Sequence, residues 1–200
     1  MKVLIATNNT HKVDEIKTVL GFEGWDYFTL REAGLTSNPV EDADTFLGNA
    51  RIKALAARNA ALAAGMTCAV LADDSGIEVD ALGGAPGVHS SRYAGIDGDD
   101  AANNAKLLRE LEGVPTEQRT GRFVCTLVYL DESGQETAAR GTIEGRIGYE
   151  EEGDGGFGYD PLFIPDCFGG KVTLAQVSQD EKNVVSHRGN ALRELKSLLQ

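Results

Sequence analysis

The sequence predicts an α/β protein in which a mixed, twisted sheet is flanked by helices, and it predicts one domain over residues 1–200. Short apolar runs typical of buried strands alternate with helical patterns in the first half of the chain. Two strand patterns joined by a short turn follow in the second half, which is typical of an antiparallel hairpin. Strands linked by helices and then a hairpin together indicate a mixed sheet. With 42% hydrophobic residues, the 200-residue chain can bury a core.

The first half opens with a buried strand, Val3 to Ala6, followed by a helix that Thr10 is placed to cap. Val13, Ile16 and Leu20 recur at helical spacing, and the glycine after Leu20 ends the helix. The next expected elements are a strand at Tyr27–Leu30, a loop over 31–44, an alanine-rich helix from Asp44 or Thr45 to Ala64, and a strand from Cys68 to Leu71.

In the second half, Ser75 and Gly76 predict a turn that ends the Cys68 strand before a strand resumes at Ile77–Val79. The antiparallel pair formed by the two later strands, over 123–130 and about 136–147, is expected to form a second lobe. The remaining expected elements are a loop over 83–87, a helix opened by Asp99 that buries Leu107, Leu108 and Leu111, a half-exposed strand at Phe123–Leu130, a turn over 131–134, a strand at about Glu136–Ile147, an acidic glycine-rich stretch over 149–158, and a final helix capped by Ser186 with the stripe Ala191, Leu192, Leu195, Leu198 and Leu199.

Composition excludes several classes of function. The net charge is −12, which argues against nonspecific binding of nucleic acid because such binding depends on Lys and Arg meeting phosphates. Three cysteines without a C-x-x-C motif indicate neither a disulfide framework nor a zinc site, and Cys68 and Cys125 lie in apolar runs typical of a core. No segment resembles a signal peptide or a membrane span, so the predicted location is the cytoplasm.

Asp73 and Asp74 follow the Cys68 strand and are the first candidate functional residues. Side chains alternate across a strand, so one carboxylate can be held by structure while the other faces a cleft. Carboxylate oxygens at the end of a sheet strand suit Mg²⁺. The alternative is that Asp-Asp-Ser-Gly is only a polar turn.

A second candidate is the junction between the first strand and the first helix. The start of a helix offers free N–H groups and a partial positive charge, which suit a triphosphate. The alternative is a plain helix cap. The stretch lacks both the dinucleotide fingerprint and the P-loop pattern. Its residues are Thr7, Asn8, Asn9, Thr10, His11 and Lys12.

Glu41 precedes the alanine-rich helix and is a candidate partner of Asp74. If its loop folds toward Asp74, the two carboxylates can share one Mg²⁺ ion. The alternative, which the sequence alone favours, is a solvated acidic loop that also contains Asp42 and Asp44. Lys53 on the same helix can either reach a phosphate or stay in solvent.

A glycine-rich aromatic segment over 155–161 contains Phe157, Gly158, Tyr159 and Asp160. Glycines beside aromatic residues indicate close approach to a flat group, and purine rings stack on aromatic faces. The alternative is a surface loop anchored by two buried aromatic rings.

Lys182, His187 and Arg188 form the last group of candidates. The latter two stand at a helix start, where their donors suit a carbonyl oxygen or a phosphate. The alternative is charge at the entry of an amphipathic helix.

Taken together, these motifs resemble the inosine triphosphate pyrophosphatase family, also called dITP/XTP pyrophosphatases. The similarity spans nearly the whole chain. The matching stretches are 7–12, Thr45-Phe46 with Asn49-Ala50, 72–76, 83–87 with 91–93, 156–161, and Glu181-Lys182 with 186–189.

The resemblance implies a homodimer of two-lobed subunits with a central cleft and Mg²⁺-dependent hydrolysis of ITP, dITP and XTP to the monophosphate and pyrophosphate. It implies that residues 7–12 hold the phosphates, that Glu41 and Asp74 bind the metal, and that Asp74 is the general base. It also implies that Ser75, residues 157–160, Lys182, His187 and Arg188 bind the nucleotide. Two positions depart from the usual family pattern: Ala43 replaces a glycine and Gly48 replaces a glutamate.

Three other functions compete with this interpretation. A nonenzymatic nucleotide-binding module would use the same phosphate loop and aromatic segment without cleavage. A phosphatase with an aspartyl nucleophile favours Asp-x-Asp at the strand end, whereas this chain has Asp73, Asp74 and Ser75. A nicotinamide-dependent oxidoreductase is disfavoured because the glycine fingerprint is missing after the first strand.

Overall fold

The computed structural model describes residues 1–7 and 10–200, with the side chains of Thr10, His11 and Asp14 left out. The helices are α1 (Thr10–Leu20), α2 (Phe46–Ala63), α3 (Asp100–Glu110), α4 (Gln179–Val185) and α5 (His187–Leu198). The strands are β1 (Lys2–Ile5), β2 (Asp26–Thr29), β3 (Ala69–Val79), β4 (Thr120–Leu130), β5 (Glu136–Ile147) and β6 (Phe163–Pro165). Short 3-10 turns cover Asp80–Leu82, Gly87–Arg92, Thr116–Gln118 and Asp166–Phe168.

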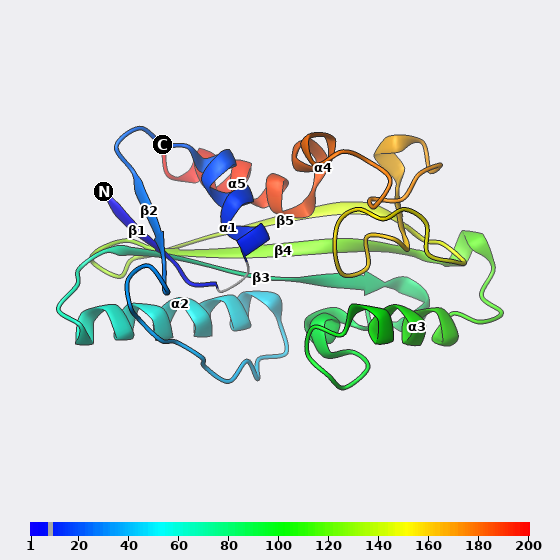
Figure 1. The fold of residues 1–200 in the computed structure, drawn as a ribbon, viewed down its shortest axis with the longest axis horizontal. Helices are drawn as coiled ribbons and strands as arrows, with labels where there is room; N and C mark the ends of the chain where they lie inside the picture. Colours follow the sequence, from blue (N-terminus) through cyan, green and yellow to red (C-terminus); the bar gives the residue numbers. More distant parts are fainter. Residues whose placement is uncertain (8–9) are drawn as a thin grey trace. The chain divides into compact units, whose positions relative to one another are not determined.

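The strands form a six-stranded sheet in the order β2-β1-β3-β4-β5-β6 (Figure 1). Strand β1 is parallel to both of its neighbours, β2 and β3, whereas β5 and β6 are antiparallel. The predicted mixed sheet flanked by helices is therefore confirmed.

The chain divides into two compact units. Unit 1 comprises Met1–Asp74, Cys125–Gly141 and Arg188–Gln200, and unit 2 comprises Ser75–Val124 and Thr142–His187. The boundaries fall inside β3, β4 and β5, so each of these strands contributes residues to both units.

Unit 1 has a core on each face of its strands, because alternate strand residues point to opposite sides. On one face, Val3, Ile5 and Leu71 pack with apolar residues of α1 and α5. On the other face, Leu4 and Val70 pack against the buried alanines of α2. Figure 1 shows α2 on one side of the sheet and α1 and α5 on the other. Cys68 and Cys125 are buried in these cores, as predicted.

Unit 2 has one apolar core, in which Leu107 and Leu111 of α3 pack with strand residues such as Ile77 and Phe123. The helix predicted to open at Asp99 is confirmed, because the Asp99 side chain accepts a hydrogen bond from the Ala102 N–H at the start of α3. Leu108, which was expected to be buried with its neighbours, is only partly buried.

Two strand predictions are wrong. Strand β3 does not stop at Ser75-Gly76 but continues unbroken to Val79, so Asp73 and Asp74 lie within a strand. Serine and glycine can adopt extended backbone, and β4 is a hydrogen-bonded neighbour of β3, whereas β1 pairs only with Ala69–Leu71. Strand β4 is not half exposed, because both of its faces are covered from Phe123 to Leu130. Period-2 alternation cannot be read from a strand that is buried on both sides.

The C-terminal region also differs from expectation. Helix α4 was not predicted, although Ser178 and Glu181 form a capping box that its sequence spacing could have revealed. Ser186 ends α4 and directly precedes α5. Leu198 is 53% exposed and does not belong to the buried stripe of α5. Strand β6 was also missed, because three residues that include a proline give no readable strand pattern.

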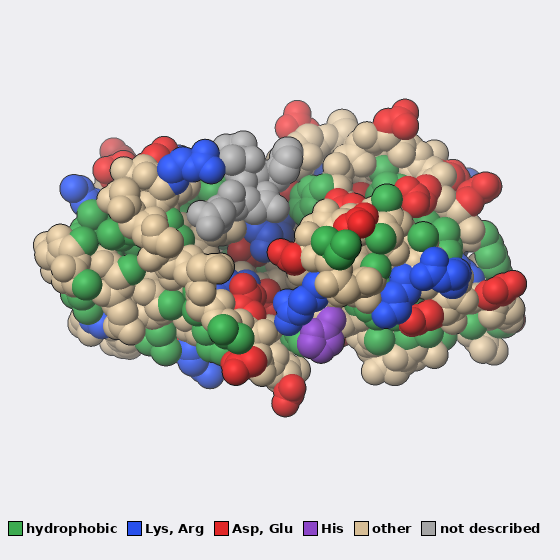
Figure 2. All heavy atoms as spheres, turned by 60° about the horizontal axis from the view of Figure 1, so that its bottom comes forward, with side chains coloured by type: hydrophobic (Ala, Val, Ile, Leu, Met, Phe, Trp, Pro, Cys, Tyr) green, Lys and Arg blue, Asp and Glu red, His purple; other side chains and the backbone are tan. Residues whose placement is uncertain are grey.

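The surface carries charges of both signs. Figure 2 shows one face, on which Lys and Arg side chains lie in small separate groups among carboxylates. Such a face offers no continuous basic path for a nucleic-acid backbone. Within the part of the chain that the structure describes, no helix has the length and apolarity needed to cross a membrane.

Candidate functional site

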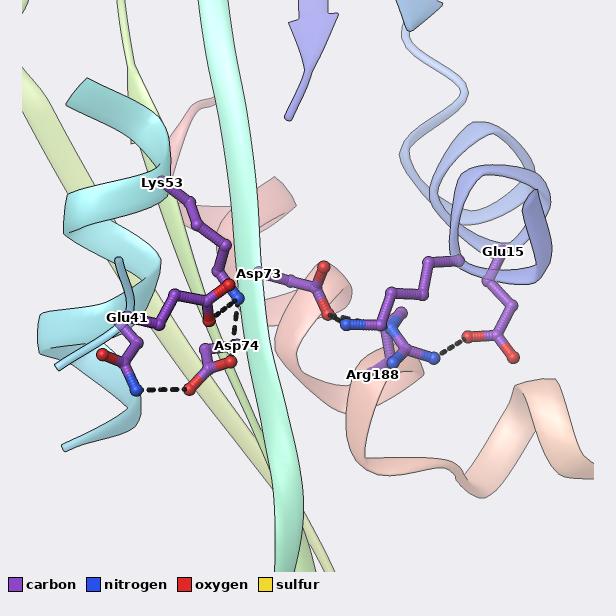
Figure 3. Close-up of polar contacts among 8 residues, drawn as sticks. Glu15, Glu41, Lys53, Asp73, Asp74 and Arg188 are labelled. Atoms are coloured by element: carbon purple, nitrogen blue, oxygen red, sulfur yellow. Dashed lines mark hydrogen bonds and ion pairs between the residues drawn. The ribbon is translucent and has the colours of Figure 1, made fainter. Parts of the chain in front are cut away.

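Asp73 and Asp74 project to opposite sides of β3, as strand alternation predicts (Figure 3). In Figure 3, Asp74 lies with Lys53 and Glu41 on the α2 side, whereas Asp73 lies with Arg188 and Glu15 on the α1 and α5 side. Both carboxylates are buried, at 2% exposure for Asp73 and 8% for Asp74. One strand therefore supports two separate polar clusters within unit 1.

The Asp74 carboxylate is held by two residues of α2. The Lys53 ammonium donates to Asp74 Oδ1 at 2.8 Å, and the Asn49 amide donates to Asp74 Oδ2 at 3.4 Å. Burial raises the pKa of Asp74 above its ordinary value, although the Lys53 charge opposes that rise. A carboxylate with a raised pKa and a cationic neighbour is suited to accept a proton.

The loop before α2 does fold toward Asp74. Glu41 Oε2 lies 2.8 Å from the same Lys53 ammonium, so two carboxylates converge on one cation. Asn49 fixes this loop, because its Oδ1 accepts a hydrogen bond from the Ala43 N–H at 3.0 Å. Asp42 and Asp44 are exposed, so Glu41 alone of the three acidic residues turns inward.

The donor set here suits a hard divalent cation that keeps water ligands. Among the described residues, no group of three or more His, Cys, Asp or Glu side chains converges on one point. Mg²⁺ is commonly bound by one or two carboxylates together with substrate phosphates and water. Glu41 and Asp74 provide two such carboxylates, both of which already lie against a positive charge.

Asp73 belongs to a buried ion-pair cluster on the other side of β3. Lys12 Nζ lies 2.8 Å from Asp73 Oδ2, and Arg188 Nε lies 3.5 Å from the same oxygen. Arg188 also donates to Glu15. Burial alone would raise the pKa of Asp73, but the charges of Lys12 and Arg188 outweigh it and hold that pKa well below its ordinary value.

Asp73 and Asp74 should therefore respond to acid with opposite signs. Asp73, with a lowered pKa, contributes stability that is present above its unfolded pKa of about 4 and is lost as the pH falls. Asp74, with a raised pKa, contributes stability below about pH 4 that is lost as the pH rises through its folded pKa. At about pH 7 we expect Asp73→Asn to lower the melting temperature and Asp74→Asn to leave it unchanged or raise it.

The measurement is thermal unfolding from about pH 7 to about pH 3 in the presence of a chelator, which keeps metal out of the comparison. The gap in melting temperature between wild type and Asp73→Asn should narrow toward acid, because Asp73 of the unfolded wild-type chain takes up a proton below about pH 4, which favours the unfolded state, while folded Asp73 stays ionised. A gap that stays constant over this range would contradict charge pairing as its cause.

Ala43 and Gly48, the two departures from the family pattern, are sterically matched. The Thr45 hydroxyl oxygen accepts a hydrogen bond from the Gly48 N–H at 3.1 Å and so caps α2. A Cβ atom at position 48 would lie only 2.5 Å from the Ala43 Cβ. Alanine at 43 therefore leaves no room for a side chain at 48.

We expect Gly48→Ala alone to lower the free energy of unfolding by about 1–3 kcal/mol, the usual cost of overpacking. In an Ala43→Gly background, the same substitution should raise it by up to about 1 kcal/mol, because alanine favours a helix over glycine. Urea unfolding of the wild type, the two single variants and the double variant measures the coupling between positions 43 and 48. Equal effects of Gly48→Ala in the two backgrounds would show that the positions are independent.

In unit 2, the predicted aromatic segment is held together by Asp160. Asp160 Oδ2 accepts a hydrogen bond from the Phe157 N–H at 2.9 Å and another from Lys182 Nζ at 2.5 Å. Lys182 Nζ also lies 4.6 Å from the centre of the Phe157 ring. Asp160 and Lys182 are almost fully buried, whereas the Phe157 ring remains partly exposed.

Tyr159 and His187 face the interior of unit 2. Tyr159 is 4% exposed, and its hydroxyl donates to the Ser90 carbonyl at 2.7 Å. The His187 ring stacks on Phe123, with centroids 4.9 Å apart and an angle of 14° between the planes. Both side chains therefore have packing partners of their own.

The other predicted site residues can be placed by their position along the chain. Thr7 follows β1 and Ser75 follows Asp74 on β3, and both are partly exposed. Thr10 and His11 open α1. Asn8 and Asn9 lie outside the described residues, as do the side chains of Thr10 and His11.

Sequence reasoning missed Glu15, quoted Asn49 in a matching stretch without giving it a role, and left Lys53 open between phosphate and solvent. Asn49 could have been noticed as a polar residue on the alanine face of α2, where a buried amide must find partners. Glu15 gave no such signal, because its burial, at 7% exposure, is seen only in the structure.

Comparison with known proteins shows one consistent relationship. The sequence model of the Ham1 family matches residues 3–198. A dITP/XTP pyrophosphatase of Exiguobacterium sibiricum is 46% identical over 199 residues, covering 100% of this chain and 97% of the relative. A dITP/XTP pyrophosphatase of Bacillus subtilis is 45% identical over 200 residues, covering 100% of this chain and 97% of the relative.

Solved structures give the same relationship. The Ham1 protein of Staphylococcus aureus superposes with a TM-score of 0.87 at 35% identity and covers 100% of this chain and 98% of its own. A nucleoside-triphosphatase described as a dITP/XTP pyrophosphatase, from Mycobacterium abscessus, superposes with a TM-score of 0.80 at 39% identity and covers 100% of both chains.

Proposed function

Because this chain belongs to the Ham1 family, we propose that it hydrolyses dITP, XTP and ITP to the nucleoside monophosphate and pyrophosphate. The observation that carries this proposal is the convergence of Glu41 and Asp74 on the Lys53 ammonium. One cluster thus contains a candidate general base, a cation and a second carboxylate. Phosphoryl transfer uses such groups to deprotonate the attacking water and to stabilise the charge that develops on the phosphate.

Glu41 and Asp74 are the residues proposed to hold Mg²⁺. When bound, the ion would neutralise phosphate charge and polarise the phosphoryl oxygens. Two carboxylates would leave room for water and substrate oxygens, which Mg²⁺ commonly keeps among its ligands.

The chain's own residues would act on the attacking water. Asp74 accepts a proton as the water oxygen bonds to the α-phosphorus, and the bond from that phosphorus to the bridging oxygen breaks to release pyrophosphate. Lys12, at the start of α1, and Lys53 offset the charge that develops on the phosphate oxygens. Thr7 and the adjacent positions 8–11 are proposed to bind the triphosphate, together with Ser75.

The partly exposed Phe157 ring is proposed to stack on the purine, with Gly158 beside it. Donors from His187 and Arg188 would favour the 6-oxo group of hypoxanthine and xanthine over the amino group of adenine. A buried donor facing a donor costs about 1–3 kcal/mol. Arg188 also forms ion pairs with Glu15 and Asp73. In this proposal, the same side chain both binds the substrate and stabilises the Asp73 carboxylate.

Three further features stay predictions from the family resemblance and the sequence. They are a homodimer, a cleft between two lobes, and a cytoplasmic location.

The experiment that tests the proposed function is a panel of ITP, dITP, XTP, ATP and GTP with Mg²⁺, in which pyrophosphate and orthophosphate are measured separately. Pyrophosphate from the first three nucleotides, released faster than from ATP and GTP, is the expected result. Orthophosphate would favour the aspartyl phosphatase, and tight binding without product would favour a nonenzymatic nucleotide-binding module. Omitting Mg²⁺ and adding a chelator should abolish turnover if the metal is needed.

A further inference from the structure

Gly158 lies in the middle of the aromatic segment. Side chains of α3 form hydrogen bonds with both its backbone N–H and its backbone carbonyl. The Gly158 N–H donates to Asp100 Oδ2 at 2.7 Å, and the Gly158 carbonyl accepts from Asn104 Nδ2 at 3.1 Å. Asp100 and Asn104 lie four residues apart, so they occupy the same face of the helix. Asn104 is 2% exposed, which means that its hydrogen bond is made in a desolvated setting.

The residues on either side of Gly158 are held as well. Tyr159 is tied to the Ser90 carbonyl, and the Phe157 N–H is tied to Asp160. Gly158 itself has a φ of +62°, a conformation that L side chains rarely adopt. A glycine in this region loses much chain entropy when it is fixed, so external hydrogen bonds are needed to keep it in place.

The Phe157 ring is the partly exposed aromatic surface of this segment, and the backbone joins it directly to Gly158, which α3 holds. We propose that Asp100 and Asn104 are positioning residues, which fix the Gly158 peptide and thereby orient the Phe157 ring toward the purine base. This inference rests on the proposed function, since it assigns a role toward the base of the same nucleotide. Neither residue needs to touch the substrate.

The test compares Asp100→Ala and Asn104→Ala with Asp100→Asn, whose amide oxygen can still accept from the Gly158 N–H. We expect each alanine variant to raise the KM for ITP roughly tenfold, the effect of about 1.4 kcal/mol, while kcat changes by less than about twofold. The Asp100→Asn variant should stay close to wild type. Asp97→Ala, at an exposed position before α3, is the matched control.

Inorganic tripolyphosphate, which has phosphates but no base, separates positioning from general damage to the site. Its inhibition constant should be unchanged in both alanine variants. An unchanged KM for ITP, or an equal weakening of tripolyphosphate inhibition, would overturn the inference. Asn104 is buried, so Asn104→Ala can fail to fold. Asp100 is exposed, and Asp100→Ala therefore tests the same inference without that risk.

Binding of inosine monophosphate, measured by calorimetry, makes the test independent of turnover. Weaker binding in both alanine variants supports the inference even if the wild type releases no pyrophosphate, in which case only the proposed hydrolysis fails. Wild-type protein that neither cleaves ITP nor binds the monophosphate overturns both.

Discussion

Asp74→Asn is expected to reduce pyrophosphate release by roughly 10³-fold while the protein stays folded, because general-base catalysis typically contributes 10²–10⁴-fold. The asparagine amide is nearly the same size as the carboxylate but cannot accept a proton from water. Burial raises the pKa of Asp74, so its charge is already costly in the folded state. Removing that charge should therefore lower activity without lowering stability.

The measurement is the steady-state rate of pyrophosphate release from ITP, with the melting temperature recorded on the same preparations. Asp42→Asn is the matched control, because Asp42 is an exposed acid in the same loop as Glu41. This control should keep the wild-type rate. An Asp74→Asn protein that turns over at an ordinary rate would remove Asp74 from the mechanism, and a loss shared by Asp42→Asn would indicate an effect of net charge.

Local patterns were enough to predict most of unit 1 and the hairpin. Strand β5 has the predicted bounds, and α2 agrees with its prediction to within a residue or two, since Thr45 is a good cap and glycine follows its end. The opposite orientation of Asp73 and Asp74 followed from strand periodicity alone, which holds whether the strand ends or continues.

The unbroken course of β3 could not be predicted, because Ser75 and Gly76 have turn propensity and only the tertiary structure overrides it. The two ion-pair clusters could not be predicted from the sequence either. Lys53 and Glu41 are twelve positions apart, while Arg188 and Glu15 are separated by most of the chain, so no local pattern joins them. Sequence marked the carboxylates as notable, but tertiary structure decided which cation each one faces.

Arg188→Met is expected to destabilise the protein by about 3–5 kcal/mol, the cost of removing one partner from a buried ion pair. Arg188 is 2% exposed and contacts both Glu15 and Asp73, which are themselves buried. Methionine fills much of the same volume, so the loss is chiefly one of charge. For a chain of this length, we expect the melting temperature to fall by roughly 10 °C.

The exposed Arg193 on the same helix supplies the control, since Arg193→Met should change the melting temperature by no more than about 2 °C. The double variant Arg188→Met/Glu15→Gln tests the cause. If the cost comes from the lost ion pair between Arg188 and the buried Glu15 carboxylate, neutralising Glu15 should restore part of the lost stability, because it removes a buried charge that no longer faces the guanidinium. If the double variant is as unstable as the sum of the two single variants, the cost lies in packing and not in charge.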